Sequence, residues 1–466
     1  MPGRGWSSVL FWLYLHFKSY TSGGDVQKTL IIKNAVLFTG PESGKVLKNY
    51  DIFVRNGIIE DIFKSGSKKI NAKKTIDANG RIVMPGFINS HMHFYSSFST
   101  GLNRVKPSEK FIEVLENLWW RLDKKLSLKA TYYSALVALI NAIKNGTTTI
   151  IDHHASPFAI RGSLFEIEKA VRSCGLRASL CYEVSDRDGK KKTIEGLREN
   201  YEFIRHNRKN NDNFVKGLFG LHASFTLSDE TLAIASDLGN SLDSGFHIHC
   251  AEDISDEEDC IRKYNMRIVE RLNKFSILGP KTILAHCVCV NEREMDIIRI
   301  NDAPVVLNPQ SNANNAVGIS DILKFAKNGI LYGLGTDAMT NNMMEELRAA
   351  LWMCHLKNKN PSAGFAEVSK LLLNNQKIAL RHFDKIAEIK KGNYADIVIL
   401  DYYPHTPLSS DNFYGHLIFG ISQSDVTTTI VNGDVLMENR ELKIGIDEKE
   451  VFEKASNIAG KIWSSF

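Results

Sequence analysis

The segment Pro85–His93 reads PGFINSHMH, a short apolar run that ends in two histidines two residues apart. Side chains at positions i and i+2 of a strand point to the same face, so His91 and His93 can converge on one cation. Two core histidines with satisfied ring nitrogens would give the same pattern. The rest of the chain decides between these two interpretations.

Strand-like apolar runs recur after this segment, and each is followed by an amphipathic helical stretch. This alternation is typical of parallel βα units that close into a barrel. We therefore predict an α/β protein whose main domain is a (β/α)8 TIM barrel. The eight predicted strands end at His93, His154, Val184, Ser224, Glu252, Val288, Pro309 and Ala338.

The two ends of the chain have a different texture, with short alternating strands separated by turn residues. Asn432-Gly433, near the C-terminus, is a strong hairpin signal. We expect both ends to pair into one small β-sandwich. The predicted organisation is an N-terminal extension (1–27), a composite β-sandwich (28–85 and 386–445), the metal-dependent barrel (86–385) and a C-terminal helix (446–466).

Composition excludes several classes of protein. With 43% hydrophobic and 24% charged residues in 466, the chain is typical of a folded globular protein. A net charge of +5 without a basic face gives no support for nucleic-acid binding. The apolar run Val9–Phe17 is too short to span a bilayer, so no membrane partner is expected. Seven cysteines without regular spacing predict reduced thiols and a cytoplasmic location.

Polar residues follow the predicted strands at their carboxyl ends, where a TIM barrel places its active site. His249 could supply a third imidazole to a cation, and Asp337 could supply a hard oxygen ligand. Glu252 could carry a proton to a leaving group, and His286 could orient a water. Taken singly, Asp337 could be a helix N-cap and His286 a packed core residue. Together with the histidine pair, they favour one catalytic site.

Four motifs in this order, PGFINSHMH, HIHCAE, AHC and GTDA, resemble the amidohydrolase superfamily. The resemblance covers nearly the whole chain from about Lys28 onward. Within the superfamily the chain is similar to the branch of cytosine deaminase, guanine deaminase and chlorohydrolases. The motifs NPQSNANNAVG and DHHASP look most like the SsnA group of aminohydrolases.

The resemblance implies one divalent metal ion, with zinc favoured and iron as the alternative. The implied ligands are His91, His93, His249 and Asp337. It also implies Glu252 as proton shuttle and His286 as activator of the water. The fourth strand presents His222 and no lysine for a carbamate bridge, which disfavours a binuclear centre. The resemblance is also compatible with a homodimer, because such relatives commonly form dimers.

Substrate contact is expected from residues at the mouth of the barrel, and the partner is expected to be a small heterocycle. The predicted contacts are His222, His154, Tyr95 and Gln310. Leu307 departs from the family pattern, because many relatives have histidine there. The chemistry of the pocket therefore cannot be carried over whole from the resemblance.

The predicted reaction is metal-dependent hydrolysis of a carbon–nitrogen bond other than a peptide bond. We expect deamination of an amino-purine, a pyrimidine or a related heterocycle, with release of ammonia. One alternative is hydrolysis of a C–Cl bond or a cyclic amide, and another is a catalytically silent barrel used for binding. Glu252 favours deamination, because a nitrogen leaving group needs protonation and chloride does not.

Overall fold

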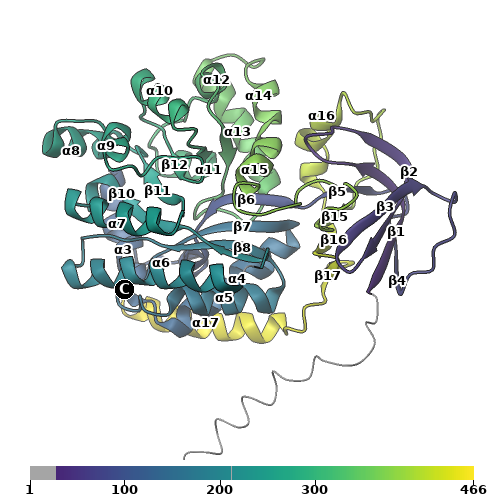
Figure 1. Ribbon diagram of the computed structural model, residues 1–466, viewed down its shortest axis with the longest axis horizontal. Helices are drawn as coiled ribbons and strands as arrows, with labels where there is room; N and C mark the ends of the chain where they lie inside the picture. The colour runs from purple at the N-terminus through teal and green to yellow at the C-terminus, as the bar shows by residue number, and fades with distance from the viewer. Residues whose placement is uncertain (1–27, 211) are drawn as a thin grey trace, which may run out of the picture.

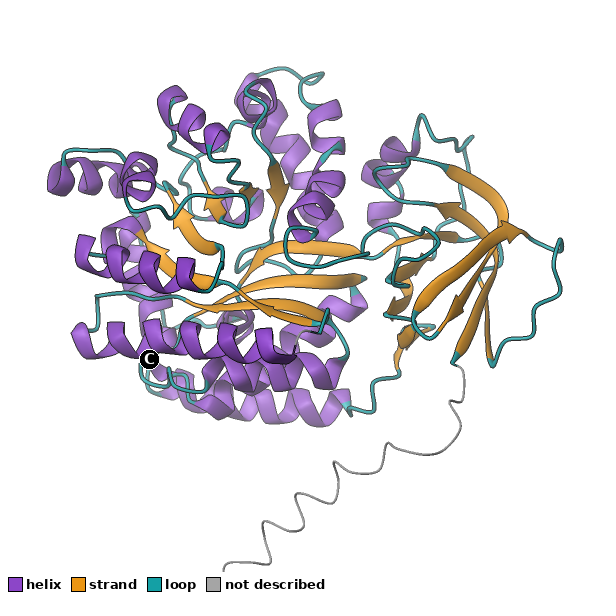
Figure 2. Ribbon diagram, in the orientation of Figure 1, coloured by secondary structure: helices purple, strands orange, loops and turns teal. Residues whose placement is uncertain are grey.

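The computed structural model describes residues 28–210 and 212–466. The predicted N-terminal extension, with its apolar run Val9–Phe17, lies outside the described residues. Strands surrounded by helices form the larger body, and a separate sheet lies to one side of it (Figure 1). Figure 2 shows that this second body is made mostly of strands.

Strands from both ends of the chain form one nine-stranded sheet. The N-terminal strands are β1 (Thr29–Phe38), β2 (Val46–Arg55), β3 (Ile58–Lys64), β4 (Lys74–Asp77) and β5 (Ile82–Pro85). The C-terminal strands are β15 (Ile397–Leu400), β16 (Val426–Val431), β17 (Asp434–Glu438) and β18 (Glu441–Leu442). The ends meet where β15 pairs antiparallel with β5.

The predicted hairpin at Asn432-Gly433 joins β16 to β17. Both turn residues adopt left-handed φ angles, +51° and +74°, as a two-residue hairpin with right-handed twist requires. Side chains from both groups of strands, including Ile32, Ile52 and Ile399, share one buried core. The exact division of the chain into domains stays a prediction.

All eight predicted barrel strands are present, in two parallel sheets. The first sheet contains β6 (Phe87–Met92), β7 (Thr147–His154), β8 (Arg177–Tyr182) and β9 (Val215–Gly217). The second contains β10 (Phe219–Ala223), β11 (Phe246–Cys250), β12 (Ile283–His286), β13 (Val305–Leu307) and β14 (Tyr332–Leu334).

Single bridges connect the edges of these two sheets. Met92 bridges Asp337 on one side, and Val184 bridges Leu221 on the other. The predicted fourth strand is interrupted at Leu218, so that β9 pairs with β8 while β10 pairs with β11. Buried apolar residues such as Ile151, Ile283 and Val306 fill the inside of the barrel below its mouth.

Helices follow the barrel strands and surround them (Figure 1). The longer ones are α4 (Leu128–Lys144), α5 (Ser163–Cys174), α6 (Lys190–Asn210), α7 (Asp229–Ser241), α8 (Ile254–Tyr264), α10 (Glu292–Ile300), α13 (Met343–Asn358) and α15 (Leu371–Ala379). The shorter ones are α9 (Ile268–Lys274), α11 (Pro309–Asn314), α12 (Ile322–Lys327), α14 (Phe365–Ser369) and α16 (Phe413–Phe419). The last helix, α17 (Glu448–Ser464), packs against α4.

One irregular helical segment contributes to the mouth of the barrel. It consists of α2 (Phe111–Val114), the π-helical turn η2 (Leu115–Trp119), α3 (Trp120–Leu122) and the 3-10 turn η3 (Asp123–Lys125). We call these residues the cover segment. A π-helical turn changes the direction in which the side chains after it point. Such turns are frequent at functional sites.

No single helix within residues 28–210 and 212–466 combines the length and hydropathy needed to cross a membrane. One pair of consecutive helices, the cover segment with α4, passes that test when the two are joined, although they are bent by 112°.

Candidate active site

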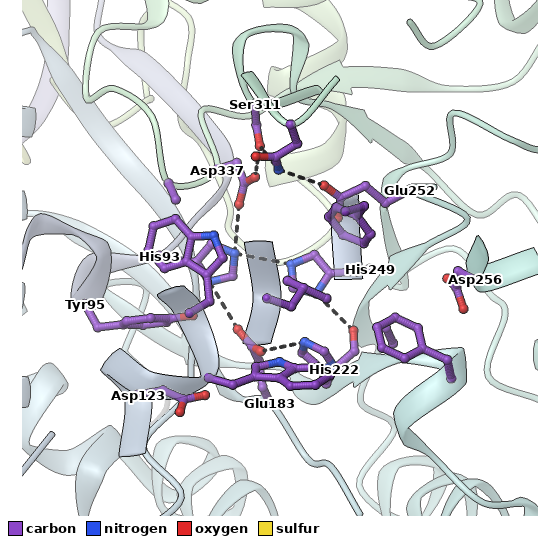
Figure 3. Close-up of a pocket in the computed structure, with 18 of the residues that line it drawn as sticks. His93, Tyr95, Asp123, Glu183, His222, His249, Glu252, Asp256, Ser311 and Asp337 are labelled. Atoms are coloured by element: carbon purple, nitrogen blue, oxygen red, sulfur yellow. Dashed lines mark hydrogen bonds and ion pairs between the residues drawn. The ribbon is translucent and has the colours of Figure 1, made fainter. Parts of the chain in front are cut away.

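Three imidazoles and one carboxylate converge at the mouth of the barrel. Figure 3 shows His93, His249 and Asp337 of this cluster. Nε2 of His93 lies 2.9 Å from Oδ1 of Asp337, and Nε2 of His91 lies 3.4 Å from the same oxygen. Nε2 of His249 lies 3.2 Å from Nε2 of His93. These side chains come from β6, from β11 and from the turn after β14, so the carboxyl ends of the strands create the cluster.

The hydrogen bonds of the rings leave their Nε2 lone pairs free. Nδ1 of His93 donates to the carbonyl oxygen of His153 at 2.6 Å, and Nδ1 of His249 donates to the carbonyl oxygen of His222 at 3.0 Å. A carbonyl can only accept, so each proton sits on Nδ1. The two Nε2 atoms then face each other as acceptors. A proton or a metal ion between them would satisfy both nitrogens.

The cluster fits a metal ion. Four ligands at about 2.0–2.1 Å from a tetrahedral zinc lie about 3.3 Å from one another, close to the separations observed here. Nε2 of His91 is fully buried and has no hydrogen-bond partner among the described residues. Burial lowers the pKa of His91 to about 4, which keeps its ring neutral and able to coordinate.

Glu252 and His286 lie beside this cluster. Oε2 of Glu252 is 3.5 Å from Nε2 of His286, and that nitrogen is 4.0 Å from Oδ2 of Asp337. Nδ1 of His286 donates to Oδ1 of Asn312 at 2.8 Å, so its Nε2 is an acceptor. Burial raises the pKa of Glu252 to about 7. Glu252 can therefore exchange a proton near neutral pH.

The backbone at the site is unusual in two places. His286 and Asp337 have left-handed φ angles of +73° and +51°. Such conformations are costly for residues with a Cβ and tend to persist at functional sites, where the surrounding structure holds them. Ser311 Oγ also donates to Oδ2 of Asp337, and Oδ1 of Asp337 faces Nε2 of His91 and of His93.

A pocket with about 670 Å³ of free space, part of it open to solvent, lies over the cluster. The cover segment and Phe225 supply an apolar wall. Of the four predicted substrate contacts, Tyr95 and His222 line the cavity. His154 and Gln310 are not among the lining residues: Nε2 of His154 is 2.9 Å from the hydroxyl of Ser156, and the backbone N–H of Gln310 donates to Glu346. Substrate contact by these four residues stays a prediction.

Three residues that the sequence patterns did not single out belong to the site. Glu183 follows β8 and lies in the cavity wall with Asp123 of the cover segment. His247 supports His91, because its Nε2 lies 2.8 Å from Nδ1 of that ring. A glutamate inside the apolar run LCYEV and a second histidine in HIHCAE were available signals for two of them. Asp123 had none, because the cover segment does not follow a strand.

Comparison with known proteins places this site in a family. The sequence model that describes the amidohydrolase family matches residues 82–436 of this chain. The chain belongs to the amidohydrolase family. This membership confirms the predicted family and the predicted enzyme class.

The relatives are similar over almost their whole length. A 5'-deoxyadenosine deaminase of Methanobrevibacter smithii is 30% identical, over 92% of this chain and 96% of that protein. A 5-methylthioadenosine/S-adenosylhomocysteine deaminase of Thermococcus sibiricus is 32% identical, over 88% of this chain and 94% of that protein. The predicted similarity of this chain to the SsnA group of the superfamily stays a prediction.

Solved structures confirm the TIM-barrel fold. A zinc-bound adenosine deaminase from Xanthomonas campestris has a TM-score of 0.82 at 21% identity, covering 93% of this chain and 98% of that one. An atrazine chlorohydrolase from Arthrobacter aurescens, complexed with zinc, has a TM-score of 0.77 at 19% identity, covering 92% and 100%. At these identities the likeness concerns the fold alone.

Proposed function

We propose that this amidohydrolase removes the exocyclic amino group of a nitrogen heterocycle by hydrolysis, releasing ammonia. The observation that carries the proposal is Glu252, a buried carboxyl with a pKa near 7, beside a cluster suited to a metal ion. The names of the two relatives support an adenosine derivative as the first substrate class to test.

The proposed metal is one zinc ion on Nε2 of His91, His93 and His249 and on Oδ1 of Asp337. When bound, it would supply Lewis-acid activation of the attacking water. Because its imidazole ligands are neutral, the zinc ion would remain a strong Lewis acid. Iron(II) suits the same ligands, so metal analysis of the purified protein decides the identity.

The remaining steps belong to side chains of this protein. Asp337 accepts the first proton as the water attacks the ring carbon. His286, whose Nε2 is an acceptor, orients the water by accepting a hydrogen bond from it. Glu252 delivers its proton to the ring nitrogen. The proton held by Asp337 then passes to the departing amine, and the hydroxyl proton of the former water returns Glu252 to its protonated form. The C–N bond breaks, a C=O bond forms, and the products are ammonia and the oxo-heterocycle.

Ammonia release tests the proposal. The zinc-loaded protein is incubated with adenosine, 5'-deoxyadenosine, 5'-methylthioadenosine, amino-pyrimidines and amino-pterins, and ammonia is measured. We expect release from at least one class. Cleavage of a cyclic amide or of a C–Cl bond without ammonia from any amino-heterocycle would contradict deamination.

We also propose that the protein works in a reducing compartment. All seven cysteines are unpaired, which supports a reducing compartment such as the cytoplasm. The homodimer expected from the resemblance is tested by light scattering of the purified protein.

A further inference from the structure

Two carboxylates in the cavity wall lack the hydrogen bonds that buried carboxylates normally have. Asp123 and Glu183 line the cavity, and their exposed fractions are 1% and 4%. Oδ1 of Asp123 and Oε1 of Glu183 have no hydrogen-bond partner among the described residues. Buried polar groups are usually satisfied, so two incompletely bonded carboxylates in the wall of one cavity call for an explanation.

The neighbours of Glu183 do not fill its lone pairs. Nδ1 of His93 lies 3.1 Å from Oε1, but its hydrogen is already donated to the carbonyl of His153 at 2.6 Å. Nε2 of His222 lies 3.8 Å from Oε2, beyond hydrogen-bond distance. Figure 3 shows Glu183 between these two rings at the edge of the cavity. Oε1 is buried between the rings of His93 and His153, whose Nδ1 atoms lie 3.1 Å and 3.5 Å from it. Oε2 is therefore the oxygen that can accept a hydrogen bond from a bound molecule.

Asp123 is held in place from behind. Its Oδ2 accepts from Arg187, and the guanidinium of Arg187 stacks over Trp120 at 5.1 Å from the ring centre. Trp120 and Asp123 line the cavity, whereas Arg187 does not. Asp123 is therefore the member of this ion pair that lines the cavity, with Oδ1 buried and unpaired and with Arg187 behind it.

The wall of the cavity contains several acidic side chains. The described residues that line the cavity include no lysine and no arginine. They include the acids Asp123, Glu183, Glu252, Asp256 and Asp337. A bound divalent ion would be neutralised in part by its own ligand Asp337. Burial raises the pKa of Glu252 to about 7 and also raises the pKa of Asp256, so these two acids contribute less negative charge. A substrate carboxylate placed beside Asp123 and Glu183 would lose its water without gaining a cationic partner. It would also be repelled by the negative charge of these side chains.

We propose that Asp123 and Glu183 select heterocyclic substrates that are neutral or cationic and carry hydrogen-bond donors, and that they exclude substrates bearing a carboxylate. This inference rests on the proposed deamination, because it narrows the substrate class of the same site. Among the molecules named for relatives, 5'-deoxyadenosine and 5'-methylthioadenosine meet the requirement. S-adenosylhomocysteine, which carries a carboxylate, does not.

The test uses two ligands that differ in charge and hardly in shape, adenosine-5'-carboxamide and adenosine-5'-carboxylate. The kcat/KM for ammonia release is measured on the zinc-loaded full-length protein, and binding of both ligands is measured by calorimetry on zinc-loaded Glu252→Gln. We expect a preference for the amide of at least about tenfold in both measurements, because like-charge contact in a dry pocket opposes the acid. The preference should shrink in Glu183→Gln and in Asp123→Asn.

Three controls and outcomes make the test decisive. Glu116→Gln removes a charge from an exposed position of the same cover segment and should keep the preference. Zinc content is measured for every variant, because Glu183 lies against the proposed ligand His93. A ratio of amide to acid that stays the same in Glu183→Gln with full zinc content would reject the inference.

The outcomes also separate this inference from the proposed function. Equal use of amide and acid, with ammonia released from both, would overturn the inference and leave deamination standing. Tighter binding of the amide without ammonia from either ligand would overturn deamination and leave the charge selection standing. Failure of both ligands to bind and to react would reject both.

Discussion

Oε2 of Glu252 lies 3.5 Å from Nε2 of His286, at the carboxyl ends of two neighbouring barrel strands. The imidazole is an acceptor at that nitrogen, because its other nitrogen donates to Asn312. Two acceptors at this separation require a shared proton donor, and a water or the proton of Glu252 itself meets that requirement. The pair is therefore arranged to hold and move one proton beside the metal cluster.

Replacement of Glu252 by glutamine should remove the proton carrier and leave the shape of the site unchanged. We expect kcat to fall by at least about 100-fold, because general acid–base groups commonly contribute that much or more. Zinc content should not change. The control is Glu258→Gln, an exposed position on α8, which should keep the wild-type kcat. Wild-type turnover by Glu252→Gln would remove this carboxyl from the mechanism.

Loss of the metal should abolish activity reversibly. The protein should contain about one zinc ion per chain, and a chelator should remove it together with ammonia release. Added zinc should restore both, and the metal-free protein should unfold at a lower temperature, because a ligand that binds the native state stabilises it. His249→Ala should not bind zinc stoichiometrically. Full turnover by metal-free protein would contradict the proposed site.

The histidines at the barrel mouth should differ in their effect on substrate binding. His222 lines the cavity, whereas His154 contacts Ser156 and is not among the lining residues. We expect His222→Asn to raise KM by about tenfold or more, since a lost contact of about 1.4 kcal/mol has that effect. His154→Asn should change KM less. A larger effect at His154 would show that this residue reaches the substrate after all.

A buried ion pair should hold the barrel and the terminal sheet together. Nη2 of Arg177 lies 3.0 Å from Oδ2 of Asp396, and both side chains are almost fully buried. Arg177→Met should lower the free energy of unfolding by about 3–5 kcal/mol, because it leaves Asp396 charged and unpaired. Combining it with Asp396→Asn should recover part of the loss.

The control for this pair is Arg440→Met. Arg440 pairs with Asp425 on the surface, where the side chains are 49% and 66% exposed. An exposed pair contributes less than about 1 kcal/mol. Denaturant unfolding followed by circular dichroism measures all the variants. Equal losses from Arg177→Met and Arg440→Met would show that the buried pair does not join the two bodies.

The barrel could be predicted from the sequence because its strands are short apolar runs whose polar residues lie at their carboxyl ends. His91 and His93 were ambiguous as a pair, and the same strand-end rule associated them with His249 and Asp337. The hairpin at Asn432-Gly433 could be predicted because it depends on two adjacent residues alone, both of which adopt left-handed φ angles.

Other features depend on contacts that no local pattern encodes. The break at Leu218 arises because β9 pairs with β8 while β10 pairs with β11. Asp123 reaches the cavity through a π-helical turn in the cover segment, which sequence periodicity does not reveal. The left-handed backbone at His286 is imposed by its surroundings and opposes the local preference of the residue.

Zinc bound at this cluster should support the release of ammonia from an amino-heterocycle. The most direct measurement is ammonia release from 5'-deoxyadenosine by protein of known zinc content, run in parallel with Glu252→Gln at equal zinc content. We expect the wild type to release ammonia in proportion to bound zinc and the variant to release almost none. Zinc bound at full stoichiometry without ammonia from this or any other amino-heterocycle would contradict this expectation.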